Sequence, residues 1–412
     1  MAPTRTPAFE ARLKKRYRAE KQFKLLGLGA IVFSVAVLLF LLTTMLINGA
    51  GGFLRAEAPV PIDFTQAGLS ADPTVLAQGA AMQQLGAQGL PEVVNFFAAK
   101  ELGEAGAAEL SGEAWREVGQ AIVDDPTILQ RQETFFLPAS ADLAAGLAGE
   151  GNAAARALAT QLASQDKLSE NFDPGFLSRS DATDPQAVGI WGALKGSMLT
   201  MLVTLLLAFP IGVSAALYLE EYAPKNRWTD LIEVSINNLA AVPSIIFGLL
   251  GLAVFLWLFP NLRSAPLIGG MTLALMTMPV IVISGRNAVK AVPPSIRDGA
   301  LAIGASPVQV VFHHVLPLAL PGMLTGTIIG MARALGETAP LLMIGMRAFV
   351  ASPPDGLTSP ATVLPVQIFL WSDEIDRGFV ERTSAAIIVL LLFLLVMNGL
   401  AIYLRNRFEK TW

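Results

Sequence analysis

Arg333 and Glu337 stand four residues apart in a long apolar run, and their types and spacing permit chemistry. Residues four apart share a helix face, so the two side chains can pair. A charge inside a membrane span costs roughly 2.5 to 3.5 kcal/mol on the insertion scale, so such residues usually mark a substrate path or a buried pair. A guanidinium is a planar fork of donors that suits phosphate oxygens. The pair is therefore either an anion site, in which Glu337 orients or neutralises Arg333 or accepts a proton, or a lock between helices.

The elements that must position this pair are apolar helices. Of the residues, 53% are hydrophobic and 15% charged. The apolar residues gather into six runs long enough to cross a hydrocarbon core of roughly 30 Å. Unbroken runs exclude a membrane barrel, whose strands show short alternation. We expect an all-α polytopic membrane protein with spans at Leu25–Ile47, Leu194–Leu219, Val234–Phe259, Leu267–Ile283, Leu318–Ile344 and Ser384–Leu404.

Basic residues predict the orientation of these spans. Eight precede the first run, from Arg5 to Lys24, and alternate loops add further Lys and Arg up to Lys410. Under the positive-inside rule both termini face the cytoplasm. We expect a cytoplasmic basic segment at 1–24, a first transmembrane helix at 25–47, a periplasmic acidic domain at 48–190, a core of five transmembrane helices at 191–404 and a cytoplasmic tail at 405–412.

The acidic region between the first two spans is long enough to fold as a small domain. It holds nineteen acidic and seven basic residues, a net charge of −12. Its apolar residues, such as Val94 and Ile122, suggest packed helices, and residues 171–184 suggest a loop. The chain has no cysteine, so no disulfide stabilises this region. We expect a mainly helical insertion without a metal or nucleophile site.

Two helix-start signals stand in the loop before the fifth span. Ser295 and Asp298 have the spacing of a capping box, and Ser306 and Gln309 have it again. Gly304 between them suits a helix end, because it can adopt the left-handed conformation. The loop is therefore predicted to be a helix-turn-helix elbow on the cytoplasmic side.

This elbow resembles the EAA loop of ATP-binding-cassette importer permeases. Asp298-Gly299-Ala300, then Gly304, then Leu316-Pro317 keep the spacing of that motif. The sequence departs from it with Asp298 for Glu, Gly299 for Ala and His314 for Ile. The resemblance implies that the first short helix, with Ser295, is the coupling helix that docks into an ATPase subunit.

Two other stretches, 239–248 and 332–342, are similar to phosphate-uptake permeases of the PstA type, and the similarity covers residues 194–404. It implies a bacterial inner-membrane permease subunit for inorganic phosphate. Its partners would be a second, homologous permease subunit, two cytoplasmic ATPase subunits, a periplasmic phosphate-binding protein and membrane lipid. The implied substrate path contains Arg333, Glu337, Thr338 and Ser244.

The fifth span also carries Gly322, Gly326 and Gly330 at four-residue intervals. Such a ridge of small residues lets another helix backbone approach closely. We expect these glycines to serve helix packing.

No G-x-x-x-x-G-K-[ST] string occurs, so this chain has no P-loop to hold ATP phosphates. Energy must come from a separate ATPase or from an ion gradient. Two alternatives stay open: an ion-coupled secondary transporter, and a membrane-anchored sensor or scaffold whose acidic domain is its working part. We expect no cofactor, no metal and no nucleic-acid partner.

Overall fold

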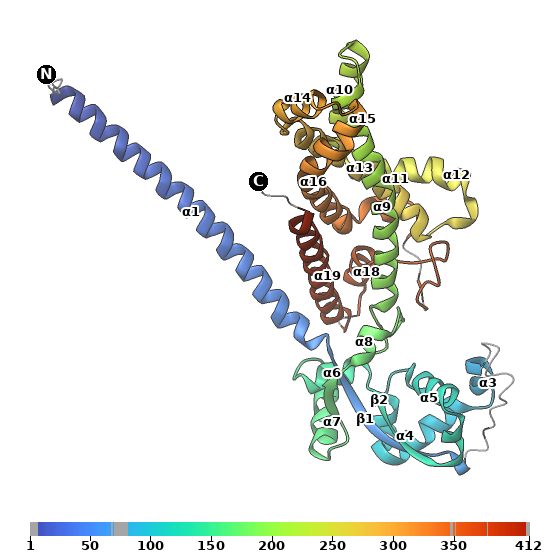
Figure 1. Ribbon diagram of the computed structural model, residues 1–412. Coiled ribbons are helices and arrows are strands. Elements are labelled where there is room, and N and C mark those ends of the chain that lie inside the picture. Colours follow the sequence, from blue (N-terminus) through green and yellow to red (C-terminus); the bar gives the residue numbers. More distant parts are fainter. Residues whose placement is uncertain are drawn as a thin grey trace.

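The computed structural model describes residues 7–66, 69, 81–346, 349–350, 352–376 and 378–408. Long helices form a bundle, and a smaller domain of short helices and strands lies beyond one end of it (Figure 1). We call this smaller part, residues 54–178, the insertion domain. The basic residues Arg5 and Lys410 lie outside the described residues.

Long apolar helices account for most of the predicted spans. Within the described residues, five helical segments are long and apolar enough to cross a membrane, and a sixth span results if one bent pair counts as a single crossing. The long helices of these segments are α1 (Pro7–Gly51), α9 (Trp191–Leu217), α13 (Pro266–Lys290), α16 (Leu316–Gly336) and α19 (Gly378–Phe408). A π-helical turn, Tyr218–Tyr222, extends α9, and α15 (Pro307–Val310) with a second π-helical turn leads into α16.

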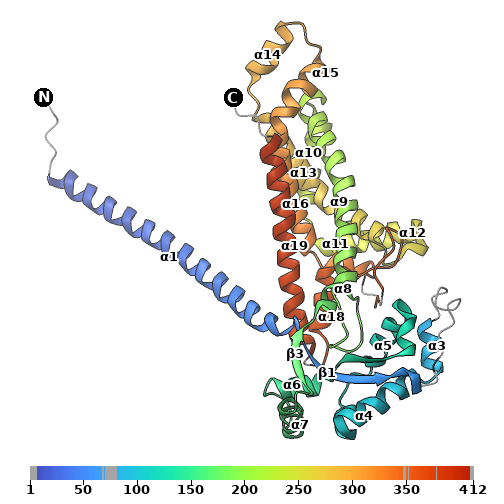
Figure 2. The same cartoon turned by 60° about the horizontal axis from the view of Figure 1, so that its bottom comes forward.

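The third span is not one continuous helix, contrary to the prediction for Val234–Phe259. α10 (Arg227–Ala240) is followed by α11 (Ser244–Leu250), a π-helical turn and α12 (Leu256–Leu258), and the two halves meet at 104°. Pro243 explains the break, because proline lacks an N–H and disfavours helix at the residue before it. Figure 2 shows α11 and α12 projecting sideways from the bundle.

The fifth span is also interrupted. α16 ends at Gly336, eight residues before the predicted end at Ile344, and α17 (Ala339–Met343) follows after two residues. Pro340 explains this end, because in a continued helix its ring would clash with the carbonyl of Gly336, four residues earlier. The last segments of the bundle are α18 (Leu364–Ser372) and α19.

α13 is the centre of the bundle and packs through small residues. A Cβ on Gly212 of α9 would lie 2.8 Å from Cγ2 of Ile281, so the two helices approach closely. α1 differs, since it diverges from the bundle and its last turns contact α19 (Figures 1 and 2). The most apolar stretch of α1 buries no residue against the rest of the described chain.

The insertion domain contains a sheet that the prediction of a mainly helical fold missed. Its order is β2-β1-β3, both pairs antiparallel, with β1 (Leu54–Asp63), β2 (Gln132–Pro138) and β3 (Ser169–Phe172). Residues 171–184 are accordingly not all loop, because β3 runs to Phe172 and a short helix follows. The helices of the domain are α3 (Ala81–Ala87), α4 (Leu90–Ala108), α5 (Ala114–Asp124), α6 (Ala141–Leu147), α7 (Ala153–Ser164) and α8 (Pro174–Ser178).

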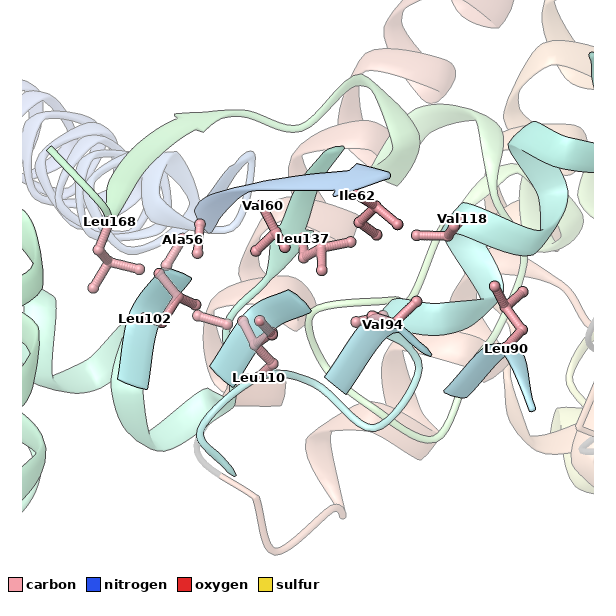
Figure 3. Close-up of a cluster of buried hydrophobic side chains, with 14 of the residues drawn as sticks. Ala56, Val60, Ile62, Leu90, Val94, Leu102, Leu110, Val118, Leu137 and Leu168 are labelled. Carbon is pink, nitrogen blue, oxygen red and sulfur yellow. The ribbon is translucent and has the colours of Figure 1, made fainter. Parts of the chain in front are cut away.

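The core of this domain lies between the sheet and its helices. Alternate residues of β1, among them Ala56, Val60 and Ile62, are buried and face α4, where Val94 and Leu102 meet them (Figure 3). This alternation is the period of two expected of a strand with one buried face. The predicted helical residues of α4 and α5 are confirmed as helical.

Candidate functional site

The elbow before α16 has the predicted overall form. α14 (Pro294–Ala302) ends before Gly304, whose φ of +90° is the left-handed conformation that glycine adopts readily. Ser306 accepts a hydrogen bond from the backbone N–H of Gln309, and the Gln309 side chain accepts one from the N–H of Ser306. The second capping box is therefore confirmed.

The first capping box is wrong. α14 begins one residue before Ser295, its N-terminal flank is Pro293, and no side chain caps it. Two consecutive prolines supply the helix start instead, because proline is preorganised for the first helical position and its missing N–H is not needed there. Ser295 and Asp298 remain exposed on α14, as does Gly299, while Ala300 is buried.

Arg297 holds α14 against the bundle. Its Nη2 donates to Oε1 of Glu221 at 2.8 Å and to the carbonyl of Val289 at 3.0 Å, and its Nη1 donates to the carbonyl of Val292 at 2.6 Å. Charge-assisted bonds of this kind are stronger than neutral ones. The elbow is thus fixed to the ends of α9 and α13.

A second group of charges stiffens the same end of the bundle. Arg286 of α13 pairs with Glu220 at 2.5 Å and with Glu233 of α10 at 2.7 Å, and Lys290 lies 3.4 Å from Glu220. The end of α14 is apolar and exposed: Leu301 is exposed, and Ile303, directly after the helix, is 84% exposed.

The glycine ridge of α16 packs against α13. A Cβ on Gly322 would lie 2.7 Å from Cβ of Ala288, and one on Gly330 would lie 2.8 Å from Cγ2 of Thr277. At Gly326 an added Cβ would overlap the side chain of Ser284. The ridge therefore sets the distance between α13 and α16. α16 leads from the elbow to Arg333.

Arg333 and Glu337 pair at the end of α16. Nε of Arg333 lies 3.3 Å from Oε1 of Glu337, and the two side chains are 46% and 20% exposed. Arg333 stands in the last turn of the helix and not near the middle of a long continuous span, because α16 stops at Gly336. Among the described residues no other hydrogen bond to the guanidinium is present, so both Nη groups are available to an anion.

Ser244 and Thr338 both stand at helix breaks. Ser244 is the first residue of α11, and Thr338 directly precedes α17. These short helices pack on each other, because a Cβ on Gly248 of α11 would lie 2.6 Å from Cα of Pro340. The structure therefore brings together α11, which starts at Ser244, and α17, which follows Thr338. The α14 residues lie at the other end of α16 from Arg333 (Figure 1).

Sequence reasoning missed a partly buried chain of ion pairs where the insertion domain meets the bundle. Nη2 of Arg382, in the first turns of α19, lies 3.3 Å from Oδ2 of Asp173, which pairs with Arg179 at 2.7 Å. Arg179 in turn pairs with Glu117 of α5 at 3.0 Å. The available signal was Asp173 before Pro174, since Asp followed by Pro is typical of a helix start, and its side chain does cap α8.

Comparison with known proteins identifies two segments. Residues 208–410 match the family described as "Binding-protein-dependent transport system inner membrane component". Residues 10–157 match a domain of unknown function, DUF3333. The first segment contains α14, the glycine ridge and Arg333.

The chain is similar to several known proteins. The chain is 31% identical over 213 residues to the phosphate transport system permease protein PstA of Yersinia pestis, covering 52% of this chain and 71% of that protein. It is 33% identical over 188 residues to the probable ABC transporter permease protein YqgI of Bacillus subtilis, covering 45% of this chain and 59% of that protein. A structure of the MetNI methionine ABC transporter has a TM-score of 0.41 and 18% identity, over 54% of this chain and 98% of that chain.

The family match over residues 208–410, which hold most of the helical bundle, identifies a membrane transport subunit. The chain belongs to the inner membrane components of binding-protein-dependent transport systems, the ABC permease family, and it is similar to phosphate transport permeases within it. Members of this family are transport subunits and not enzymes.

Proposed function

We propose that this chain is one of two permease subunits of an ATP-driven importer of inorganic phosphate. The observation that carries the proposal is the guanidinium of Arg333, which is half exposed, held by Glu337 through Nε, and left with its two Nη groups available. That arrangement offers a planar pair of donors to a tetrahedral oxyanion. Similarity to phosphate transport permeases supports phosphate as the substrate.

The helix breaks before α11 and before α17 support a path for an anion. Where a helix is interrupted inside a membrane, its first N–H groups are unpaired, and such half-helix ends serve transported ions in other transporters. Ser244 and Thr338 stand at two such starts, and their helices α11 and α17 pack together. Glu337 neutralises Arg333 when the path is empty, and an entering phosphate binds the two free Nη groups.

α14 is the proposed contact with an ATPase subunit. Its exposed residues Ser295, Asp298 and Gly299 form the docking face, Ala300 packs inward, and Gly304 turns the chain. Arg297 makes the elbow stiff, so movement of the ATPase is transmitted to α13 and, through the glycine ridge, to α16. Two ATPase subunits would serve the two permease subunits.

A second permease subunit is the proposed cover of α10 to α12. α10 has no buried residue, and its exposed residues include Asn237 and Asn238, which shortly precede the break. Exposed amides are unfavourable in lipid, which offers them no hydrogen bonds. A homologous subunit packed here would bury these amides and complete a shared path.

The basic residues near both ends of the chain predict its orientation in the membrane and, with it, the side on which further partners meet it. Both termini face the cytoplasm of a bacterial inner membrane, and the insertion domain lies in the periplasm with the phosphate-binding protein that delivers the substrate. The six crossings include the bent α10–α11 pair. In this arrangement membrane lipid surrounds α1.

Uptake in living cells tests the function. In cells lacking only this chain, phosphate uptake at micromolar concentration should be lost, and restoring the chain should recover it. Sulfate and molybdate uptake are the controls and should not change. Phosphate uptake that persists without the chain under these conditions would contradict the proposal.

A further inference from the structure

The first half of α1 carries a dense basic segment, residues 12–24. It holds seven Lys and Arg residues and a single acidic residue, Glu20, which gives a net charge of +6. All seven basic side chains are exposed. Lys24 pairs with Glu20 at 2.6 Å, and none of the other six forms an ion pair with any side chain that the structure describes. The segment therefore presents six positive charges without a counter-charge.

The apolar half of the same helix places this segment at a membrane surface. α1 runs unbroken from Pro7 to Gly51, so the basic segment passes directly into the apolar stretch Leu25–Ile47. At 1.5 Å per residue this stretch is about 35 Å long, which is enough to cross a hydrocarbon core of roughly 30 Å. The most apolar part of α1 has no buried residue. The residues just before Leu25 therefore emerge among lipid head groups.

Two exposed aromatic side chains independently indicate the same boundary. Tyr17 is 61% exposed and Phe23 is 77% exposed. Tyrosine is enriched at membrane–water interfaces, because its ring is apolar and its hydroxyl group is polar. An exposed phenylalanine is stabilised where head groups meet acyl chains. Basic and aromatic side chains thus interleave where α1 leaves the membrane.

The basic end of α1 stands apart from the rest of the described chain. The last turns of α1 contact α19 closely, since a Cβ on Gly49 would lie 2.5 Å from Cδ1 of Ile388. From there α1 diverges, and its first turns lie away from α14 and the other helices of the bundle (Figures 1 and 2). α1 is also inclined to the long helices of the bundle (Figure 1). If those helices cross the membrane upright, this inclination brings the basic segment closer to the membrane surface.

We propose that the basic segment of α1 binds the head groups of anionic phospholipids. Lys14, Arg18 and Lys21 recur at intervals of four and three residues, so they share one helix face and can meet several lipid phosphates together. The negative potential of anionic lipids attracts Lys and Arg within a Debye length, which is about 8 Å at physiological salt. With both termini in the cytoplasm, these lipids are those of the inner leaflet. The inference does not depend on the transported substrate.

Two other roles for the positive charges account for fewer of the observations. An acidic protein surface would attract the same charges, but it would not explain why an exposed Phe23 and an apolar helix follow them directly. A role only in orienting the chain during insertion would require no preference for anionic lipid in the inserted protein. Lipid preference in the folded chain therefore separates the proposal from both.

Quenching of one fluorophore by spin-labelled lipid measures that preference. The chain has no cysteine, so Gln22→Cys, at an exposed position beside Lys21, gives a unique labelling site. Phosphatidylcholine nanodiscs holding the full chain contain a small, equal fraction of lipid with a nitroxide near its head group, either phosphatidylglycerol or phosphatidylcholine. We expect quenching by the phosphatidylglycerol to be at least about twofold stronger at physiological salt. Equal quenching by the two lipids would overturn the proposal.

Charge variants show whether the basic segment causes the preference. Lys14→Gln, Arg18→Gln and Lys21→Gln together remove half of the unneutralised charges, and glutamine is a good helix former. In this variant the preference for phosphatidylglycerol should fall by at least about half, and added sodium chloride should lower it in the unaltered chain as well. An unchanged preference in the triple variant would also overturn the proposal.

A charge-matched control separates a local contact from general attraction to the protein. The variant Lys225→Gln, Arg227→Gln and Arg407→Gln removes three exposed basic residues outside α1. With the same label at Gln22→Cys, it should keep the lipid preference of the unaltered chain. Equal weakening in the control and in the α1 variant would mean that net charge alone attracts the lipid, and it would contradict a binding segment on α1.

Discussion

The guanidinium of Arg382 lies 3.3 Å from the carboxylate of Asp173, and each side chain is only 2% exposed. Arg382 also donates to the carbonyl of Gly52 at 2.7 Å, at the point where α1 leads into β1. One residue of α19 thus contacts both connections between the insertion domain and the bundle. We infer that the insertion domain is fixed to α19 through this pair.

Replacing Asp173 with Asn should loosen this junction. The amide keeps the helix-capping oxygen but leaves Arg382 and Arg179 without their shared counter-charge. Removing one partner of a buried ion pair destabilises by about 3 to 5 kcal/mol. Thermal unfolding of the purified chain should show a clear drop in Tm, whereas the exposed control Asp166→Asn should not. An unchanged Tm for Asp173→Asn would contradict the role of the pair.

Gly299 on the exposed side of α14 tests the coupling contact. Nothing lies within 4 Å of a Cβ built there, so Gly299→Leu should fold normally within the isolated chain. Its added bulk should obstruct the partner's groove and reduce ATP-driven uptake at least about tenfold, which is about 1.4 kcal/mol of lost docking energy. Gly299→Ala is the matched control, and it should retain uptake. Normal uptake and ATPase co-purification with Gly299→Leu would refute docking through this face.

Gly326→Ala should separate α13 from α16. The new Cβ would overlap the side chain of Ser284, and overpacking of this kind typically destabilises by about 1 to 3 kcal/mol. Gly399→Ala in α19 is the matched control, because nothing lies within 4 Å of a Cβ at that position. Unfolding in denaturant should distinguish the two. Equal stability of both variants would mean that the ridge does not set the helix spacing.

Asp181 should make stability depend on pH. Burial raises the pKa of its carboxyl above the ordinary range, although the indole N–H of Trp371, which donates to it at 3.0 Å, lowers that pKa in part. A raised folded-state pKa means that the favourable contribution of the protonated acid is present at low pH and is lost as pH rises through that pKa. Asp181→Asn keeps the acceptor for Trp371 without the charge. Its Tm relative to the unaltered chain should therefore increase from pH 4 to pH 7, and a constant difference would contradict this.

Hydropathy predicted the long helices and glycine spacing predicted a close helix contact along α16, because both depend on local composition, but only the structure shows that the contacting helix is α13. Pro243 and Pro340 are visible in the sequence, but the helix breaks that they cause are not. Proline is tolerated in membrane helices when neighbouring groups compensate, so its presence alone does not predict a break. Only the structure therefore shows that Ser244 begins a helix and that Arg333 lies in the last turn of one.

The sheet of the insertion domain was hidden for a related reason. β1 carries Pro59 and Pro61, which argue against a strand in sequence. They are accommodated because β3 pairs only with residues 54–57, so this part of β1 has a partner on one side alone. The ion chain through Arg382 and Asp173 joins residues more than 200 apart, and no local pattern reports such a pairing.

The most direct test of the transport account is phosphate uptake by the double variant Arg333→Gln with Glu337→Gln, normalised to the amount of protein in the membrane. If the pair only locks helices, a neutral amide pair should restore function, because it is less unfavourable to bury than a single charge. If Arg333 binds phosphate, the double variant should insert and assemble normally but fail to transport, and Arg333→Lys should transport poorly because it lacks the planar fork. We predict loss of uptake with normal assembly. Near-normal uptake by the double variant would contradict a substrate contact at Arg333 and leave the pair with a structural role.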